Sequence, residues 1–389
     1  MRVLHVYRTY FPDQASGIAE AIRQICLATR PHGVGSTIFT LSPSPCSGRP
    51  PDPEAKVVRA RSWAAPASCD LGGIQAFTRF RREARQADLI HYHFPWPFAD
   101  ILHLSTRPMA PAVMTWHSDV VRQATLVGFY TPVMNRMLRR MSLIAATSPA
   151  YAKTSTVLAD PAVRNRVRVL PLGVDESSFH GDGDASVLQR LGLAGPFVLF
   201  LGAMRYYKGL DVLLEASKAI GAPVVLAGGG PELERLRGLA RNSGRMIFAG
   251  EVSEVEKLAL LKSCTALVLP SNKRSEAYGI VLVEAALCGK PMVTCEIGTG
   301  TSYVNLDGET GFVVEPDNAG ALSRALNRLL EDPPLAAHLG QAARRRYEEN
   351  FSGRVLGRAH MEFYREALEA QPPLSTGNRT AFQESLEDR

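Results

Sequence analysis

A length of 389 residues suits two α/β domains of similar size, and 46% hydrophobic with 21% charged residues is typical of a globular protein. No apolar run approaches the ~20 residues that a membrane-spanning helix needs, which argues against an integral membrane protein. The first ten residues lack the apolar core of a signal peptide, and the six cysteines form no C-x-x-C pair. We therefore expect a cytoplasmic protein with reduced thiols.

The net charge of +6 is unevenly distributed. Residues 1–180 carry 21 Lys and Arg against 12 Asp and Glu, a net charge of +9, whereas residues 181–389 carry 23 against 26, a net charge of −3. A basic first half favours an anionic partner. Because the sequence lacks the interleaved basic and aromatic residues that accompany nucleic-acid binding, we expect a membrane surface or a polyphosphate-linked acceptor and no nucleic acid.

Short apolar runs alternate with helical patterns through the first half of the chain. The runs expected to form buried strands are Val3–Tyr7, Thr37–Leu41, Val57–Ala60, Leu89–Tyr92, Ala112–Thr115, Leu143–Ala146 and Val167–Leu170. The segments expected to form amphipathic helices are Ile18–Arg30, Ile74–Gln86, Tyr130–Arg140 and Tyr151–Leu158. Such an alternation predicts a parallel, doubly wound α/β sheet.

The alternation restarts after a linker that contains Pro171 and two glycines, Gly181 and Gly183. The strands expected in this second half are Phe197–Leu201, Val224–Ala227, Met246–Ala249, Ala266–Leu269, Met292–Cys295 and Gly311–Val314. The domains predicted are therefore residues 1–175 and 181–350. A further helix is expected over Val355–Leu368, followed by a polar, disordered tail over residues 371–389.

Candidate ligand-binding groups of the first domain lie at or after its strands. They are the start of a helix and several histidines. The backbone N–H groups of Gly17 and Ile18, at the start of a helix, suit a phosphate. His117 follows a strand and either faces a ligand or hydrogen-bonds within its own loop. His91 and His93 point the same way along another strand. No third ligand accompanies this pair in the sequence, so we expect no metal site, and His93 either lines the cleft or is structural.

Two helices of the first domain carry basic runs. Their arginines are Arg79, Arg81, Arg82 and Arg85 on one helix and Arg136, Arg139 and Arg140 on the other. A charge run of this kind is usually a solvated face. Each basic residue near an anionic membrane surface contributes ~1 kcal/mol, however, so the run also suits peripheral membrane binding.

Two turns of the second domain carry candidate nucleotide-binding groups. Arg205 and Lys208 follow its first strand, and two cations at this spacing can hold a diphosphate, although they can also be a solvated helix face. Gly228 and Gly229 belong to Ala227-Gly-Gly-Gly-Pro231, which lacks the later glycines of a dinucleotide fingerprint. These glycines either let a nucleotide approach the backbone or close a tight turn.

The stretch Pro270–Gly289 contains an apolar strand end, a polar loop with Glu276, and a helix that starts near Gly279. Glu284 is the only ionisable residue of that helix and lies among Ile, Val and Leu side chains. A carboxylate in such surroundings costs several kcal/mol unless it accepts hydrogen bonds. Its partner is either a Lys or Arg from a neighbouring element or the hydroxyl groups of a sugar.

Glu276-Ala-Tyr-Gly-Ile-Val-Leu-Val-Glu284 resembles the E-x7-E motif of the retaining glycosyltransferases of family 4. The resemblance implies the GT-B fold, in which two doubly wound Rossmann-like α/β domains face each other across a cleft. The first domain is then the acceptor side, joined by the C-terminal helix (353–370) that crosses back to it, and the second binds the nucleotide sugar. The resemblance also implies no cofactor and no required metal ion.

The resemblance assigns roles to the candidate residues. Arg205 and Lys208 would neutralise the leaving diphosphate, Glu276 would bind hydroxyls of the donor sugar, and Glu284 would bind the ribose. His117 would position the sugar from the other domain and complete a catalytic set with Glu276, Arg205 and Lys208. The remaining residues expected to contact the donor are Gly17, Ile18, His93, Gly228, Gly229, Val252, Ala277, Tyr278, Gly279 and Ile280.

Tyr7–Asp13 and Gly298–Val304 are similar to segments of bacterial mannosyl- and rhamnosyltransferases that build O-antigen polysaccharide. This similarity implies transfer of mannose or rhamnose, from a GDP-linked donor, to a lipid-linked glycan. Two alternatives remain open. A GT-B sugar-nucleotide epimerase would consume its donor without an acceptor, and a non-catalytic sugar-nucleotide-binding protein would bind the donor without turnover.

Overall fold

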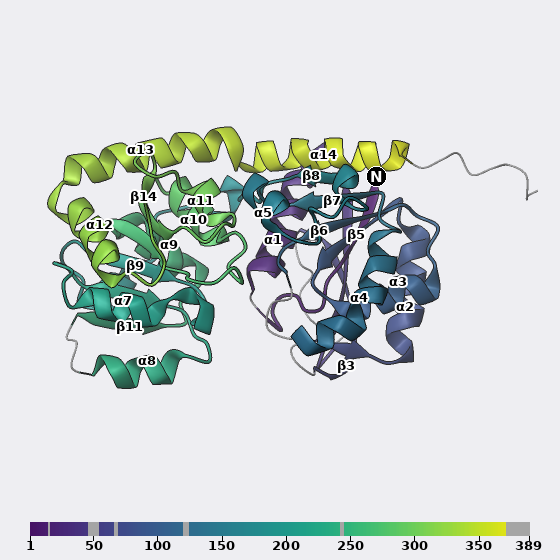
Figure 1. Cartoon of the computed structure of the whole chain (residues 1–389), viewed down its shortest axis with the longest axis horizontal. Coiled ribbons are helices and arrows are strands. Elements are labelled where there is room, and N and C mark those ends of the chain that lie inside the picture. The colour runs from purple at the N-terminus through teal and green to yellow at the C-terminus, as the bar shows by residue number, and fades with distance from the viewer. Residues whose placement is uncertain (15, 46–53, 66–68, 120–123, 242–244, 371–389) are drawn as a thin grey trace, which may run out of the picture.

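The computed structural model describes residues 1–14, 16–45, 54–65, 69–119, 124–241 and 245–370, so the predicted tail (371–389) lies outside the described residues. Within them the chain forms two α/β domains that lie side by side (Figure 1). Two long helices, α13 (Pro333–Asn350) and α14 (Gly353–Glu369), run one after the other along one side of both domains.

The described part of the N-terminal domain contains an eight-stranded sheet in the order β4-β3-β2-β1-β5-β6-β7-β8. All its neighbours pair in parallel except β3 and β4, which pair antiparallel. The strands are β1 Arg2–Val6, β2 Gly35–Ser42, β3 Lys56–Ala64, β4 Leu71–Gly72, β5 Leu89–Phe94, β6 Ala112–Trp116, β7 Leu143–Ala146 and β8 Val167–Val169. The helices are α1 Gly17–Thr29, α2 Ile74–Gln86, α3 Pro97–Thr106, α4 Ala124–Leu138 and α5 Pro149–Thr154.

The described part of the C-terminal domain contains a six-stranded, wholly parallel sheet in the order β11-β10-β9-β12-β13-β14. The strands are β9 Val198–Leu201, β10 Val224–Ala227, β11 Met246–Gly250, β12 Ala266–Leu269, β13 Met292–Cys295 and β14 Gly311–Val314. The helices are α6 Ser186–Arg190, α7 Leu210–Ser217, α8 Leu233–Ala240, α9 Glu254–Ser263, α10 Ile280–Leu287, α11 Thr301–Val304 and α12 Ala319–Glu331.

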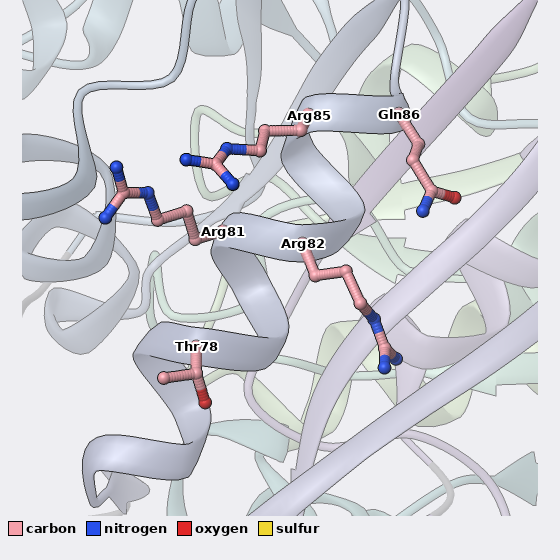
Figure 2. A pocket seen from close by; sticks show the side chains of 5 residues that line it. All are labelled: Thr78, Arg81, Arg82, Arg85 and Gln86. Atoms are coloured by element: carbon pink, nitrogen blue, oxygen red, sulfur yellow. The ribbon is translucent and has the colours of Figure 1, made fainter.

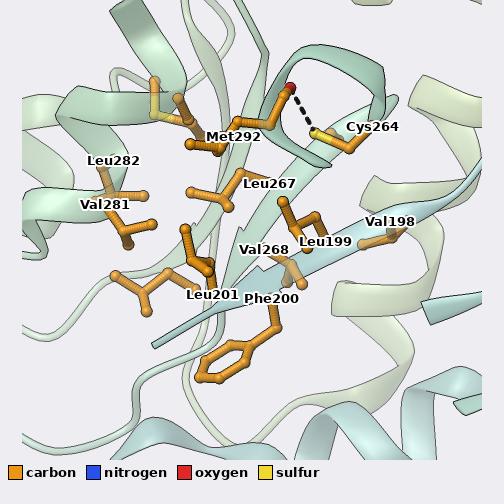
Figure 3. Close-up of a cluster of buried hydrophobic side chains, with 14 of the residues drawn as sticks. Val198, Leu199, Phe200, Leu201, Cys264, Leu267, Val268, Val281, Leu282 and Met292 are labelled. Carbon is orange, nitrogen blue, oxygen red and sulfur yellow. Dashed lines mark hydrogen bonds between the residues drawn. The ribbon is translucent and has the colours of Figure 1, made fainter. Parts of the chain in front are cut away.

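Both faces of each sheet are covered, which explains why the strands are continuous apolar runs. In β6, Met114 packs into the apolar cluster on one face of the sheet, whereas Val113 packs into the cluster on the other face, beneath α14. In the C-terminal domain, Figure 3 shows Val281 and Leu282 of α10 beside residues of the central strands, such as Leu267. This packing fixes where α10 begins, at the carboxyl edge of the sheet.

Helix α14 crosses back to the N-terminal domain, as expected. It lies against α1 so closely that a Cβ atom on Gly357 would be 2.1 Å from the carbonyl oxygen of Ala28, so only glycine fits there. Tyr364 of α14 also contacts Nδ1 of His91 on β5, with 2.9 Å between the two polar atoms. The crossing helix is therefore an integral layer of the N-terminal domain.

The expected strands are all present, with ends that differ by three residues or fewer except in β3, which runs to Ala64. In the described part of the N-terminal domain, helix α3 and the short strand β4 were not expected. Helix α4 also begins six residues before its expected start at Tyr130. Helix α3 starts with Pro97 and has Asp100 in its first turn, but it has no side-chain N-cap and ends at Arg107 in the left-handed region rather than at a glycine. The cap residues that usually mark helix ends are therefore missing.

Candidate active site

The N-termini of α1 and α10 meet where the two domains face each other. A Cβ atom on Gly17 would lie 3.9 Å from Cγ2 of Ile280. Ser16 caps α1 by accepting a hydrogen bond from the Ala19 N–H at 3.2 Å, and Gly279 starts α10 with a φ of 78°. The first turns of both helices carry N–H groups without intrahelical partners and a partial positive charge. Two such ends together form a place for an anion.

The turn after β9 carries Arg205 and Lys208 to the same place. It packs tightly against the loop after β12, because a Cβ atom on Gly209 would be 2.0 Å from the carbonyl oxygen of Pro270. The N–H of Asn272 also donates to the carbonyl oxygen of Tyr207 at 3.1 Å. The two loops that hold the cation pair and Glu276 therefore form one unit.

Lys208 and Glu276 are paired. The buried Lys208 ammonium donates to Oε2 of Glu276, and the Ser271 hydroxyl donates to the same oxygen at 3.2 Å. Burial alone would lower the pKa of Lys208, but the Glu276 carboxylate and Tyr207 together raise this pKa above its ordinary value. Lys208 is therefore charged, and Glu276 neutralises it until a ligand arrives.

Arg205 is exposed, in the turn that follows β9. Burial raises the pKa of Tyr7, which follows β1, and the positive charges of Arg8 and Arg205 act against this rise. Within the described parts of the chain, no hydrogen bond or ion pair occupies the Arg205 guanidinium. Its guanidinium is thus positioned to bind an anion at the mouth of the site.

Glu284 pairs with Lys257 of α9, whose Nζ lies 3.1 Å from Oε1 of Glu284. Of the two alternatives for this carboxylate, the structure thus contains the lysine partner. Burial raises the pKa of Glu284, Lys257 opposes this rise, and Glu20 of α1 adds to it. Glu20 belongs to the first turn of α1, whose N-terminus meets that of α10, the helix that carries Glu284.

The three glycines after β10 close a tight turn. Gly228 and Gly230 have φ values of 133° and 137°, and Cβ atoms on them would lie 2.3 Å and 2.6 Å from the carbonyl oxygens of Gly202 and Met204. This close packing supports the turn that carries Arg205. Val252 follows β11 at the same edge of the sheet and packs partly against the domain core.

His117 lies at the end of β6 and is buried, with Nε2 3.0 Å from Nδ1 of His93. His93 was expected either to line the cleft or to be structural. It is 1% exposed and lies beneath His117, with its other ring nitrogen, Nε2, 3.1 Å from Nδ1 of His5. His5 was not predicted. The sequence signal for His5 was only that a histidine lies within a predicted buried strand. In the structure this strand, β1, pairs with β5, and His5 lies opposite His91.

Arg274 is a second residue that the sequence analysis did not single out. It lies two residues before Glu276 and reaches across to α5, where its Nη2 donates to Oγ1 of Thr154 at 3.0 Å. It also lies 3.8 Å from Asp119, two residues after His117. On the same side of the cleft, Tyr278 donates its hydroxyl to the carbonyl oxygen of Leu172 at 2.7 Å. These contacts hold the loops of the two domains together beside the site.

Comparisons with known proteins agree with this arrangement. The description "Glycosyltransferase Family 4" matches residues 15–178, and "Glycosyl transferases group 1" matches residues 190–346. O-antigen chain mannosyltransferase C of Escherichia coli is 37% identical over 95% of this chain and 100% of its own length. The chain belongs to glycosyltransferase family 4. D-rhamnosyltransferase WbpZ of Pseudomonas aeruginosa is 41% identical to this family 4 glycosyltransferase, over 90% of this chain and 92% of its own length.

Solved structures show the GT-B fold of this glycosyltransferase. Sucrose-phosphate synthase from Thermosynechococcus elongatus superposes with a TM-score of 0.76 at 22% identity, covering 95% of this chain and 100% of that one. HepE from Anabaena, in complex with UDP and glucose, superposes with a TM-score of 0.74 at 18% identity, covering 94% and 99%. The expected family and fold are confirmed.

The buried histidines predict that the protein loses stability in mild acid. Burial lowers the pKa of His5 and His117 to about 3 and of His103 and His360 to about 4, and it holds the pKa values of His91 and His93 well below 6.5. Below pH 6.5 the unfolded chain takes up protons that the native state does not bind. Each of these histidines then lowers the free energy of unfolding by about 1.4 kcal/mol for each pH unit, until the pH reaches the pKa of that histidine in the folded state.

The measurement is urea denaturation between pH 7.5 and pH 5, followed by tryptophan fluorescence, because Trp63, Trp96 and Trp116 all belong to the N-terminal domain. Burial raises the pKa of Asp100 to about 8, and this group opposes the histidines over the same range, as does Glu284. The more numerous histidines should still dominate, and the free energy of unfolding should fall toward pH 5. A constant or rising value would contradict the neutral, buried state of the histidines.

Proposed function

We propose that this glycosyltransferase moves a hexose, mannose or rhamnose, from a GDP-linked donor to a lipid-linked glycan in the synthesis of cell-surface O-antigen polysaccharide. The observation that carries the proposal is the similarity, along nearly the whole chain, to an O-antigen mannosyltransferase and to a D-rhamnosyltransferase. The positively charged site between the domains supports it, because an activated sugar carries a diphosphate. We place the reaction at the cytoplasmic face of the membrane, where such a donor and acceptor would meet.

In this proposal the diphosphate lies between the two helix N-termini. Arg205 and Lys208 stabilise the negative charge that develops on it as the glycosidic bond breaks, which is an electrostatic role. Lys208 has three N–H donors, so it can bind a phosphate oxygen while it keeps Glu276. Because these cations and the helix ends supply positive charge, we propose that the reaction needs no metal ion or other cofactor.

The sugar and the nucleoside extend to opposite sides of the diphosphate. Glu276 and the N–H groups of residues 277–280 bind hydroxyls of the sugar, with Gly17 and Ile18 beside the distal phosphate. Glu284 accepts hydrogen bonds from the ribose through Oε2, because Lys257 already holds Oε1. The base lies near Gly228, Gly229 and Val252, at the carboxyl ends of β10 and β11.

We propose that the anomeric configuration is retained. The acceptor hydroxyl attacks from the side on which the diphosphate departs, the new glycosidic bond replaces the sugar–phosphate bond, and a phosphate oxygen takes the acceptor proton. His117, which is neutral, orients the sugar and does not attack it. Closure of the two domains would exclude water and limit hydrolysis of the donor.

The test of the function is a donor assay with and without a lipid-linked glycan. We expect GDP release from GDP-mannose or GDP-rhamnose that depends on the acceptor, with retention of the anomeric configuration in the product by proton NMR. Arg205→Ala should reduce turnover by roughly a hundredfold, the scale for losing one transition-state donor. Conversion of the donor without an acceptor would favour the epimerase, and binding without turnover would favour a non-catalytic protein.

Glu284→Gln should weaken the binding of GDP by about 1.5–3 kcal/mol, the range for a hydrogen bond to a charged group. The measurement is isothermal titration calorimetry with GDP alone, which needs no acceptor. The matched control is Glu254→Gln, because Glu254 is the other carboxylate on Lys257, at 2.7 Å, and is exposed on α9. Equal affinities for the wild type and Glu284→Gln would remove Glu284 from the nucleotide site.

A basic surface on α2 supports a membrane partner for the N-terminal domain. Arg81, Arg82 and Arg85 are exposed and line a hollow with Thr78 and Gln86, and Figure 2 shows the arginines extending away from the helix. At the start of α2, Ile74 and Trp63 are each 73% exposed, and the Trp63 ring lies against Gly73. An exposed tryptophan and isoleucine at one end of α2, with arginines toward the other end, suit the interface of an anionic membrane.

Helix α4 covers the same side of the domain as α2, with α3 packed between them. It ends at Leu138, so of the other basic run only Arg136 lies on the helix, and Arg139 and Arg140 follow it. Arg136, Arg139 and Arg140 are exposed there. No helix among the described residues is both long and apolar enough to cross a membrane. We propose that this face of the N-terminal domain instead rests on the membrane that holds the lipid-linked acceptor.

Sedimentation with vesicles that contain anionic phospholipid tests this surface. The wild type should bind at low ionic strength and dissociate as salt is added. Arg81→Gln/Arg85→Gln should weaken the partition by about 2 kcal/mol, or roughly 30-fold. Arg324→Gln/Arg345→Gln, two exposed arginines on α12 and α13, should bind like the wild type. No binding of the wild type at low salt, or an equal loss in both variants, would contradict the proposed surface.

A further inference from the structure

Three histidines form a continuous hydrogen-bonded chain beneath the candidate active site. Nε2 of His117 contacts Nδ1 of His93 at 3.0 Å, and Nε2 of His93 contacts Nδ1 of His5 at 3.1 Å. All three rings are at most 5% exposed. At the inner end of the chain, Nε2 of His5 is buried and has no partner among the described residues. This chain of three histidines therefore runs from His117, at the end of β6, to His5 inside the domain. Its one unpaired nitrogen among the described residues is Nε2 of His5.

Neutral histidines in such a chain have their protons oriented in a common direction. A neutral imidazole has one N–H donor and one bare acceptor nitrogen. If His93 donates from Nδ1, it must accept at Nε2, and the reverse holds as well. Only two arrangements satisfy both contacts. In one, His117 has its proton on Nδ1 and His5 has a bare Nε2, and in the other, His117 has its proton on Nε2 and His5 has an unpaired N–H.

The unpaired nitrogen of His5 decides between the two arrangements. A buried N–H without an acceptor is rarer in proteins than an acceptor without a donor, because the lost hydrogen bond of a donor is the more costly. A bare Nε2 on His5 is therefore favoured. Then Nδ1–H of His5 donates to His93, and Nδ1–H of His93 donates to Nε2 of His117. His117 is left with its proton on Nδ1.

Neighbouring groups hold the chain in place without adding charge to it. His91 stacks on His93 with 4.3 Å between ring centroids, and its own nitrogens contact Oγ1 of Thr115 at 2.7 Å and the Tyr364 hydroxyl at 2.9 Å. His360 of α14 contacts the carbonyl oxygen of Leu356 at 3.0 Å through Nδ1. The groups that shift the pKa of His5, His93 and His117 electrostatically are other histidines, so no carboxylate holds a proton on the chain.

A metal ion is the other occupant to consider, since ring nitrogens of His5, His91 and His93 lie within 4.8 Å of one another. Every ring nitrogen of these residues except Nε2 of His5 already has a hydrogen-bond partner. A metal would have to break these contacts and to place a double positive charge in a buried group of neutral ligands, which is costly without a carboxylate. The contacts favour the hydrogen-bonded chain.

We propose that His93 and His5 are positioning residues that keep His117 in its neutral Nδ1–H form, so that it presents an N–H donor to the sugar bound in the cleft. The identity of the ligand rests on the proposed function, but the state of His117 does not. The residues act in series. His93 contacts His117 directly, and His5 acts only through His93.

Nitrogen-15 NMR of the full chain labelled at histidine tests the state of His117 without any substrate, since a protonated ring nitrogen and a bare one have distinct shifts. His117→Gln identifies its signals. We expect a protonated Nδ1 and a bare Nε2 in the wild type, and a mixture of the two forms in His93→Phe. A protonated Nε2 in the wild type, or an unchanged state in His93→Phe, would overturn the proposal. Stoichiometric metal in the purified protein would overturn it as well.

Activity with the donor then shows whether this state matters. His93→Phe should lower kcat by roughly tenfold, about the value of one hydrogen bond to the sugar, and His93→Asn should restore most of the loss, because its amide can donate in place of Nδ1–H. His103→Phe is the matched control, a buried histidine that contacts Tyr92 on the opposite face of the sheet. Equal losses of kcat in His93→Phe and His103→Phe, or no recovery of kcat in His93→Asn, would contradict a positioning role and show that His93 serves only in packing.

Discussion

The meeting of two helix N-termini, α1 from one domain and α10 from the other, is the constraint on which the site depends. Each helix end is fixed by its own domain, through the cap at Ser16 and through the left-handed Gly279 that starts α10. Together they create a positive potential where the two domains meet. The two glutamates of the E-x7-E motif lie on either side of it and pair with lysines, which keeps the added positive charge of Lys208 and Lys257 tolerable when no ligand is bound.

The same pairing gives the two glutamates different environments. Glu276 belongs to a loop that packs against the Arg205–Gly209 turn and hydrogen-bonds to it, so the position of Glu276 depends on that of the cation pair. Glu284 belongs to a helix that packs against the sheet, and its side chain is buried. A ligand that enters between the domains therefore meets an exposed guanidinium first and the buried lysine–glutamate pairs afterwards. This order suits a molecule with a central diphosphate and hydroxyl-bearing groups on both sides.

Much of the fold could be predicted from the sequence because its strands are continuous apolar runs, and the E-x7-E spacing indicated the family. The site residues chosen from that spacing remain a prediction. What could not be predicted is contact between distant segments. Lys257 lies 27 residues from Glu284, and Arg274 reaches α5 only because the domains face each other. His5 is one histidine in a short strand, and nothing local shows that β1 lies beside β5 and joins a histidine chain. Helix α3 was missed for a local reason, the absence of recognisable caps.

The central claim is that an activated sugar binds with its diphosphate between the two helix N-termini. The most direct measurement is a crystal structure of the protein with GDP. Our account predicts phosphate oxygens beside Gly17 and Gly279 and within hydrogen-bonding distance of Arg205 and Lys208, with the ribose at Glu284. A structure in which GDP binds elsewhere, while Lys208 and Lys257 keep their glutamates and the space between the helices contains only water, would contradict it.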